Sequence, residues 1–293
     1  MYELNQVGER TYYVNSPAKI GIYLADGGQA YLIDSGNDKD AGKKVRTLLE
    51  ERDWSLRGII NTHSHADHVG GNRYLQQQTG CKIFVPGVEA AFTRYPILEP
   101  VSLYGGYPHK DLRHKFLMAQ ESEAVDITDG DFPGELEVIS LDGHCLQMIG
   151  LRTPDDVVFL ADSVSSAATL EKYQISFLFD VEAYLRTLDR VETLEAKLFI
   201  PAHAEATEDV RPLVALNRQK VYEIADTLQT MLKTPMGFDE LLQRVFTEFG
   251  LTMTFEQHAL VGSTVRSYLS WLKDSGKVQA EILENMVIWS SLS

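Results

Sequence analysis

The spacing of apolar residues predicts alternating strands and helices over the first two thirds of the chain. Short runs rich in β-branched residues indicate strands, and apolar residues every three or four positions indicate helices. Strands are expected at 21–24, 30–33, 57–62, 81–85, 137–141, 157–160 and 197–200, and helices at 38–52, around 74–75 up to Gly80, and at 181–195. This alternation is typical of an α/β (α+β) protein.

Residues 93–125 interrupt this pattern, because Tyr, Pro and Gly recur there without a period of two or 3.6 residues. A long irregular stretch inside a compact domain is usually a functional loop. We therefore expect an insert or lid. Tyr104, Tyr107, His109 and Lys110 are candidates for a lid that contacts an anionic substrate, although a solvated basic face is the simpler interpretation.

Helices replace the alternation after about residue 212. Apolar residues form one helical face in 238–249 and another in 261–272, and two short strand-like runs surround Glu284-Asn285. Two helices followed by a hairpin resemble a winged-helix module. The expected domains are a larger α/β domain at 1–212, which includes the insert, and a small helical domain at 213–293.

Composition limits the classes of partner. The formal net charge is −15, which argues against non-specific nucleic-acid binding because such binding depends on Lys and Arg that neutralise phosphates. Only Cys81 and Cys145 are present, so no disulfide framework is expected. The first residues lack the features of a signal peptide, and no apolar run reaches membrane-spanning length. We expect a cytoplasmic protein with no membrane partner.

Three of the eight histidines fall within residues 63–68, in the motif THSHADH. His63, His65, Asp67 and His68 follow a predicted strand, and on a turn beyond a strand alternate side chains converge on one cation. Imidazole and carboxylate suit zinc and other borderline divalent metals. A catalytic zinc site uses about three protein ligands and keeps one position open. This segment is therefore too small for two complete sites.

Three further candidate ligands come later in the chain. Each follows a predicted apolar strand by a few residues, as the first motif does. If these strands point the same way, all the candidate side chains gather at one edge of the sheets. The three residues are His144, Asp162 and His203.

The motif H-S-H-A-D-H-V-G-G, with Gly-His at 143–144, Ala-Asp at 161–162 and Ala-His at 202–203, resembles the metallo-β-lactamase-fold hydrolases over roughly residues 10–210. The resemblance implies an αββα four-layer sandwich with two mixed sheets face to face. Within that family, an aspartate at 162 together with His68 is similar to the glyoxalase II-like thioesterases, lactonases and nucleic-acid-processing members. The segment from Gly143 to Met148 departs from the G-H-[ST]-x-G-[HS] motif of many thioesterases.

The resemblance also implies a ligand set and two divalent cations, zinc in the first instance and otherwise iron or manganese. Asp34 would orient the ligands from behind, as such partners do. The implied first site is His63, His65 and His144, the second is Asp67, His68 and His203, and Asp162 bridges them.

The implied mechanism is hydrolysis by a hydroxide shared between the cations, which lower the pKa of water and stabilise the oxyanion. Asp67 would orient that hydroxide or accept its proton, as a general base does. The expected substrate is an ester, thioester or lactone of a small metabolite.

Two alternatives stay open at this point. A phosphodiesterase or nuclease could use the C-terminal module, but from 255 to 276 only Arg266 and Lys273 oppose Glu256 and Asp274. DNA-reading helices usually carry a basic stripe, so we expect this module to serve packing or a homodimer. A mononuclear iron oxygenase would keep only some of the ligands, and metal analysis would distinguish it.

Overall fold

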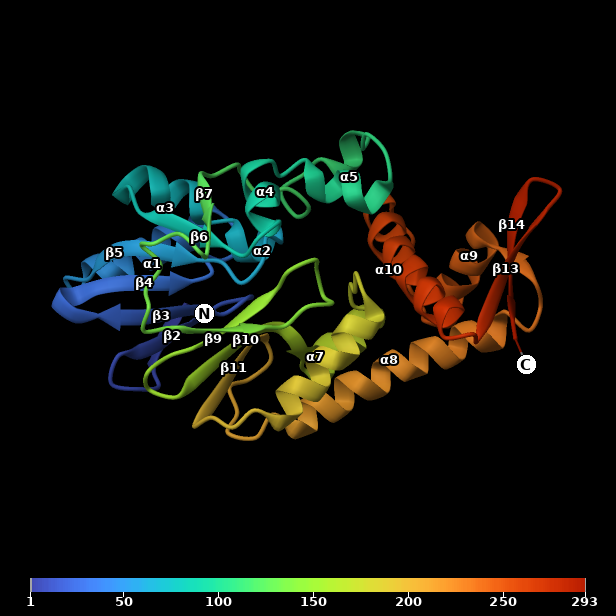
Figure 1. Cartoon of the computed structure of the whole chain (residues 1–293). Coiled ribbons are helices and arrows are strands. Elements are labelled where there is room, and N and C mark those ends of the chain that lie inside the picture. The colour runs from blue at the N-terminus through green and yellow to red at the C-terminus, as the bar shows by residue number, and fades with distance from the viewer. Residues whose placement is uncertain (1, 293) are drawn as a thin grey trace.

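The structure is a computed structural model that describes residues 2–292, and Figure 1 shows its arrangement. Two sheets lie at the centre with helices outside them, and a smaller helical part with its own sheet extends to one side. The strand order is β1-β2-β3-β4-β5-β6-β7 in the first sheet, β11-β10-β9-β8 in the second and β12-β14-β13 in the third.

The first sheet joins an antiparallel half to a parallel half. β1 (Glu3–Gln6), β2 (Thr11–Asn15), β3 (Ile20–Ala25) and β4 (Gln29–Ile33) pair antiparallel, and β4, β5 (Ser55–Ile60), β6 (Lys82–Val85) and β7 (Ala124–Asp126) pair parallel. Along β4, Ala30 and Leu32 pack under the outer helices, whereas Tyr31 and Ile33 face the second sheet. Both faces are buried, which explains the continuous apolar runs in the sequence.

The second sheet packs its inner face against the first. It contains β8 (Glu137–Ser140), β9 (Ile149–Arg152), β10 (Val157–Ser165) and β11 (Leu198–His203), with β10 and β11 parallel and the other pairs antiparallel. Phe159 and Ile200 share one hydrophobic cluster with Tyr31 and Phe84 of the first sheet. The sequence pattern did not predict β9.

Helices cover both outer faces. The helices α1 (Lys39–Glu50) and α3 (Asn72–Thr79) pack on the first sheet through Val45 and Leu75. The second sheet is covered by α7 (Val181–Thr193) and α8 (Arg211–Met231). The expected αββα four-layer sandwich is therefore confirmed.

The insert at 93–125 is more regular than the sequence indicates. It begins within α4 (Glu89–Arg94) and contains α5 (Leu98–Tyr104) and the 3-10 turn η2 (Lys110–Leu112). These helices are too short to produce a clear apolar period, so the pattern missed them. Leu103 and Leu112 anchor the insert in a small cluster with Ala259 of the C-terminal part.

The C-terminal part contains the expected helices and closing hairpin. Its elements are β12 (Met236–Gly237), α9 (Phe238–Glu248), α10 (Phe255–Asp274), β13 (Val278–Leu283) and β14 (Met286–Ser291). One continuous hydrophobic cluster extends from β10 through α7 and α8 to α9 and α10, and α8 crosses the expected boundary near residue 212. The two-domain division and the winged-helix resemblance stay predictions. Within residues 2–292, no helix has the length and apolar character that a membrane span requires.

Candidate metal centre

The segment after β5 carries four candidate ligands through a tight turn into the short helix α2 (Ala66–Val69). The backbone carbonyl of His68 anchors the turn, because it accepts from Asn61 Nδ2 at 3.3 Å and from Ser35 N at 2.8 Å. A Cβ at Gly71 would lie 2.3 Å from the Ser35 carbonyl oxygen. Glycine is therefore required at this approach, and the following helix begins directly beneath the site.

Asp162 lies within β10, which corrects the expectation that it follows the strand. β10 continues to Ser165, but its register against β11 shifts on both sides of Ala161, whose φ is 49°. This left-handed conformation is unusual for a residue with a side chain. The regular ladder therefore ends near Phe159, where the apolar pattern ends. His203 is likewise the last residue of β11 and not a residue beyond it.

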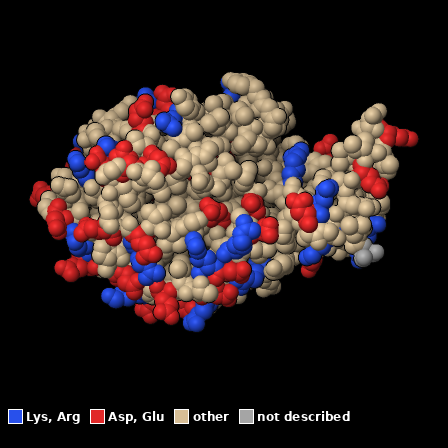
Figure 2. Space-filling view, viewed as in Figure 1, with Lys and Arg blue, Asp and Glu red and all other residues tan. Residues whose placement is uncertain are grey.

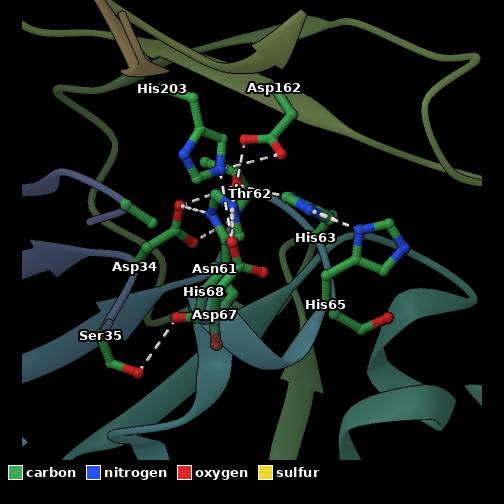
Figure 3. Close-up of polar contacts among 12 residues, drawn as sticks. Asp34, Ser35, Asn61, Thr62, His63, His65, Asp67, His68, Asp162 and His203 are labelled. Carbon is green, nitrogen blue, oxygen red and sulfur yellow. Dashed lines mark hydrogen bonds and ion pairs between the residues drawn. The ribbon is translucent and has the colours of Figure 1, made fainter. Parts of the chain in front are cut away.

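Three histidine nitrogens converge at one end of the site, and Figure 3 shows two of these rings beside the other ligands. His65 Nδ1 lies 3.1 Å from His63 Nε2 and 2.9 Å from His144 Nε2. The ligand atoms of this group all lie within 4.8 Å of one another. Neutral imidazole offers only a lone pair at an unprotonated nitrogen, so this convergence favours a shared proton or cation.

A second group contains Asp67, His68 and His203, whose ligand atoms also lie within 4.8 Å of one another. Asp162 lies between the groups. Its Oδ2 is 3.5 Å from His144 Nε2 and 3.4 Å from His203 Nε2, and its Oδ1 is 3.1 Å from His68 Nε2. The structure thus brings all seven candidate ligands together.

In each candidate histidine, the ring nitrogen that points away from the other candidate ligands has a partner of its own. Such contacts fix the ring and its tautomer and leave the other nitrogen free to bind a cation. The contacts are His63 Nδ1 to Thr62 Oγ1 at 3.0 Å, His68 Nδ1 to Asp34 Oδ2 at 2.8 Å, His144 Nδ1 to the Phe177 carbonyl at 3.0 Å, His203 Nδ1 to the Pro17 carbonyl at 3.1 Å, and His65 Nε2 facing Glu99 Oε1 at 3.6 Å.

Unsatisfied polar atoms test whether these residues fit metal ions. His68 Nε2 and Asp162 Oδ1 are buried, and neither makes a well-oriented hydrogen bond within the described part of the chain. Buried polar atoms without partners are rare and costly. Nitrogen and carboxylate donors that converge from several elements suit divalent cations such as zinc. The donor set therefore fits divalent cations.

Burial lowers the pKa of some histidines of the site, whereas a neighbouring carboxylate raises the pKa of another. Burial lowers the pKa of His144 to about 4, and burial with the neighbouring His68 holds the pKa of His63 well below its ordinary value. The carboxylate of Asp162 raises the pKa of His203 to about 10. A metal binds the neutral imidazole, and burial favours that form at His63 and His144.

Two glutamates in contact with the site, the buried Glu89 and the partly exposed Glu99, were not found from the sequence. Glu89 Oε2 accepts a hydrogen bond from Ser64 Oγ, and its Oε1 accepts from Gln147 N at 3.2 Å. Glu89 therefore joins the loop that carries His65 to the loop that follows His144. Glu99 on α5 faces the same histidine. A glutamate in a short helix looks solvent-facing in sequence, and only its burial reveals the contact.

A cavity of about 690 Å³ lies beside the candidate ligands. The insert contributes to its wall through Glu99, Lys115, Phe116 and Leu117. The residues proposed for a lid, Tyr104, Tyr107, His109 and Lys110, are not among those that line it. The His109 ring packs 5.0 Å from the Phe255 ring at the start of α10, and the lid hypothesis stays a prediction.

Comparison with known proteins identifies the family. The sequence profile of the Metallo-beta-lactamase superfamily matches residues 21–203. The chain belongs to this superfamily. The matched range includes Asp34 and all seven candidate ligands. The crystal structure of a metallo-beta-lactamase family protein from Thermus thermophilus superposes on this chain with a TM-score of 0.74 at 17% identity. The superposition covers 97% of this chain and 99% of the Thermus chain. At this identity the likeness shows the fold alone.

Curated relatives of this metallo-beta-lactamase superfamily protein include hydroxyacylglutathione hydrolases. The protein from Shewanella loihica is 26% identical over 228 residues, which are 75% of this chain and 77% of that one. The protein from Erythrobacter litoralis is 28% identical over 144 residues, and the chain spans only 46% of its length. These matches support a metal-dependent hydrolase, the enzyme class that the motifs predict.

Proposed function

We propose that the chain uses two divalent cations, zinc in the first instance, to hydrolyse an ester, thioester or lactone of a small metabolite. The observation that carries the proposal is the convergence of six nitrogen and oxygen ligands into two groups on either side of a seventh, Asp162. Among the three bond types, the relatives named hydroxyacylglutathione hydrolases favour the thioester.

The side chains of the two groups position the cations in this proposal. When bound, the cations supply an activated water and polarise the scissile carbonyl. The side chains fix where this happens, because each histidine is held from behind by a carbonyl, hydroxyl or carboxylate. The proposed first site is His63, His65 and His144, the second is Asp67, His68 and His203, and Asp162 contacts both.

Asp67 is the proposed proton acceptor. It lines the cavity, and its Oδ2 lies 3.3 Å from His203 Nε2. Although desolvation raises the pKa of Asp67, the neighbouring His68 and His203 lower it below its ordinary value. The carboxylate therefore stays ionised at neutral pH, the form that both a metal ligand and a proton acceptor require.

The nucleic-acid alternative gains no support from the described residues. The Arg266 guanidinium lies 3.8 Å from the Phe238 ring centroid, and burial lowers its pKa. Arg266 is exposed, and its guanidinium stacks on a ring of the same C-terminal part. Figure 2 shows Lys and Arg interspersed with Asp and Glu on the face in view, where nucleic-acid-binding proteins carry a continuous basic surface.

Metal quantitation combined with a substrate panel tests the proposal. We expect two divalent cations per chain and hydrolysis of one class among esters, thioesters, lactones and phosphodiesters. Asp67→Ala should lower kcat by at least about a hundredfold, the scale of a lost general base. Asp226→Ala, an exposed change on α8, serves as the control. Activity that survived Asp67→Ala unchanged would sink the assignment, and one iron per chain would favour the oxygenase.

A further inference from the structure

The cavity beside the candidate ligands has two unlike ends. Its rim is exposed and includes Lys115, Phe116 and Tyr173. Its inner part extends between α7, α8 and α10 and is lined by side chains that are less than a tenth exposed. These are Tyr184, Asn217, Val221, Ile224, Val261, Thr264 and Tyr268.

The inner part suits an uncharged aliphatic group. Leu170, Ile175, Val221, Ile224 and Val261 line it, and apolar atoms gain free energy by leaving water for such a surface. The ammonium group of Lys220, which lies near the inner part, is already paired. Its Nζ donates to Glu223 Oε1 at 2.8 Å and to Gln174 Oε1 at 3.0 Å. A charged substituent would lose its hydration here without a free partner.

Most polar groups of the inner part are also satisfied. Asn217 Nδ2 donates to the Ser165 carbonyl at 2.9 Å, and the Tyr184 hydroxyl lies 3.4 Å from Asn217 Oδ1. Thr264 Oγ1 donates to the Leu260 carbonyl at 3.1 Å. The first two contacts join α8 to β10 and α7 to α8, the third lies within α10, and these polar groups are thereby paired.

Tyr268 is the exception among these residues. Its side chain is 0% exposed, and its hydroxyl has no hydrogen-bond partner within residues 2–292. A buried hydroxyl without a partner costs about 1–3 kcal/mol. The ring packs among Val265, Leu269 and Leu272 of the same cluster, a role that phenylalanine would fill equally well. The hydroxyl is therefore the feature that needs a ligand.

We propose that the inner cavity holds an uncharged aliphatic acyl chain of the substrate and that the Tyr268 hydroxyl donates a hydrogen bond to a keto or hydroxyl oxygen on that chain. This rests on the proposed function, because the scissile carbonyl must lie at the candidate ligands. Asp162 and Tyr184 line the same cavity, so a chain that leaves the carbonyl can pass inward toward Tyr268. The substrate class is an ester or thioester of an oxygenated medium-chain acid. Its hydrolysis adds one water and yields the acid and the free alcohol or thiol.

The test compares S-acyl thioesters of N-acetylcysteamine with acetyl, hexanoyl and octanoyl chains, and with oxo groups at successive positions of the longer chains. In the wild type, one oxo position should raise kcat/KM about tenfold over the plain chain, the worth of one hydrogen bond. Tyr268→Phe should abolish this preference and leave the melting temperature unchanged or higher. Tyr222→Phe, an exposed change on α8, should keep the preference.

A second variant tests the cavity itself. Val261→Trp fills the inner part and should lower the octanoyl-to-acetyl ratio of kcat/KM by about tenfold or more, since the lost apolar contacts exceed about 1.4 kcal/mol. An unchanged ratio, or equal losses on oxo and plain chains in Tyr268→Phe, would overturn the inference while hydrolysis itself still supports the proposed function.

A binding measurement separates the two proposals. Methyl pentyl ketone should bind the wild type in calorimetry and bind Tyr268→Phe about tenfold more weakly, with no hydrolysis required. If the ketone binds in this way but no thioester, ester or lactone is cleaved, the proposed function fails and the cavity assignment stands. If substrates are cleaved but the ketone binds both proteins equally, the assignment fails.

Discussion

Asp34 Oδ2 and His68 Nδ1 lie 2.8 Å apart in the protein interior. Asp34 follows β4 with a left-handed φ of 62°, and its other oxygen accepts from Thr62 N at 2.8 Å. The strained backbone is therefore held by contacts on both carboxylate oxygens. As a result the His68 ring is fixed with Nε2 directed at Asp162, 3.1 Å from its Oδ1.

Asp34→Asn should weaken metal binding without unfolding the protein. The neutral amide no longer supports the His68 ring as a carboxylate does, and losses of such partners lower metal affinity by about 10–100-fold. Competition with a chromophoric chelator measures this directly, and one of the two cations should be affected far more than the other. Asp26→Asn, on an almost fully exposed side chain, is the control. Equal affinities in both variants would contradict the role of Asp34.

Glu89→Ala should lower stability and weaken metal binding, although Glu89 is not a candidate ligand. Its carboxylate joins Ser64 to Gln147 N, and its removal leaves these two part-buried donors without this acceptor. The free energy of unfolding should fall by about 1–3 kcal/mol, and the cation near His65 should be held more weakly. Urea unfolding of the metal-free protein and chelator competition measure the two effects. Glu121→Ala, an exposed change, is the control, and a similar loss there would refute the argument.

Removal of metal should destabilise the protein strongly. The candidate ligands join both sheets, so cations that bind only the folded chain shift the unfolding equilibrium by about 2.7 kcal/mol per site at a hundredfold excess over Kd. A chelator should therefore lower the melting temperature of the wild type. Asp162→Ala should show a much smaller drop on chelation, because it contacts both groups. A wild-type melting temperature insensitive to chelation would speak against resident metal.

Gly71→Ala should be poorly tolerated. A Cβ there would come within 2.3 Å of the Ser35 carbonyl oxygen, so either the segment that follows β4 or the motif turn must move. Strain of this kind costs about 1–3 kcal/mol or more, and the displaced turn should also bind metal more weakly. Gly134→Ala has nothing within 4 Å of the added atom and is the matched control. Similar stability of the two variants in urea unfolding would contradict the close approach.

Asp155 should make stability depend on pH. Its Oδ2 accepts from Thr11 Oγ1 at 2.7 Å and from Arg10 N at 2.8 Å, and although burial raises the pKa of Asp155, these hydrogen bonds lower it below its ordinary value. An aspartate whose pKa is lowered in the folded state stabilises the fold at pH values above its unfolded pKa of about 3.9. That stabilisation is lost as the pH falls through the pKa of the folded state. Asp155→Asn should therefore destabilise the metal-free protein by about 1 kcal/mol at neutral pH.

The difference between wild type and Asp155→Asn should shrink as the pH falls below about 4. Urea unfolding at neutral and acidic pH measures it, with exposed Asp226→Asn as the reference. A difference that stayed constant with pH would assign the effect to packing and not to the ionised carboxylate.

The sequence by itself determined the alternation of strands and helices, and its motifs carried the resemblance that implied the sandwich and the ligand set. Apolar runs and helical spacing are local patterns, so strands such as 30–33 and the helix at 38–52 could be predicted. The motif at 63–68 is also local, and the strand ends placed His144, Asp162 and His203 near it.

Only the tertiary structure decided the features that depend on contacts between distant segments. Glu89 contacts the site because it is buried between two loops, and His109 of the insert packs against Phe255 of α10. The irregular pairing around Ala161 turns Asp162 inward within its strand. Tyr268 reaches the cavity only because α10 folds back onto α8, a long-range packing that no local pattern encodes.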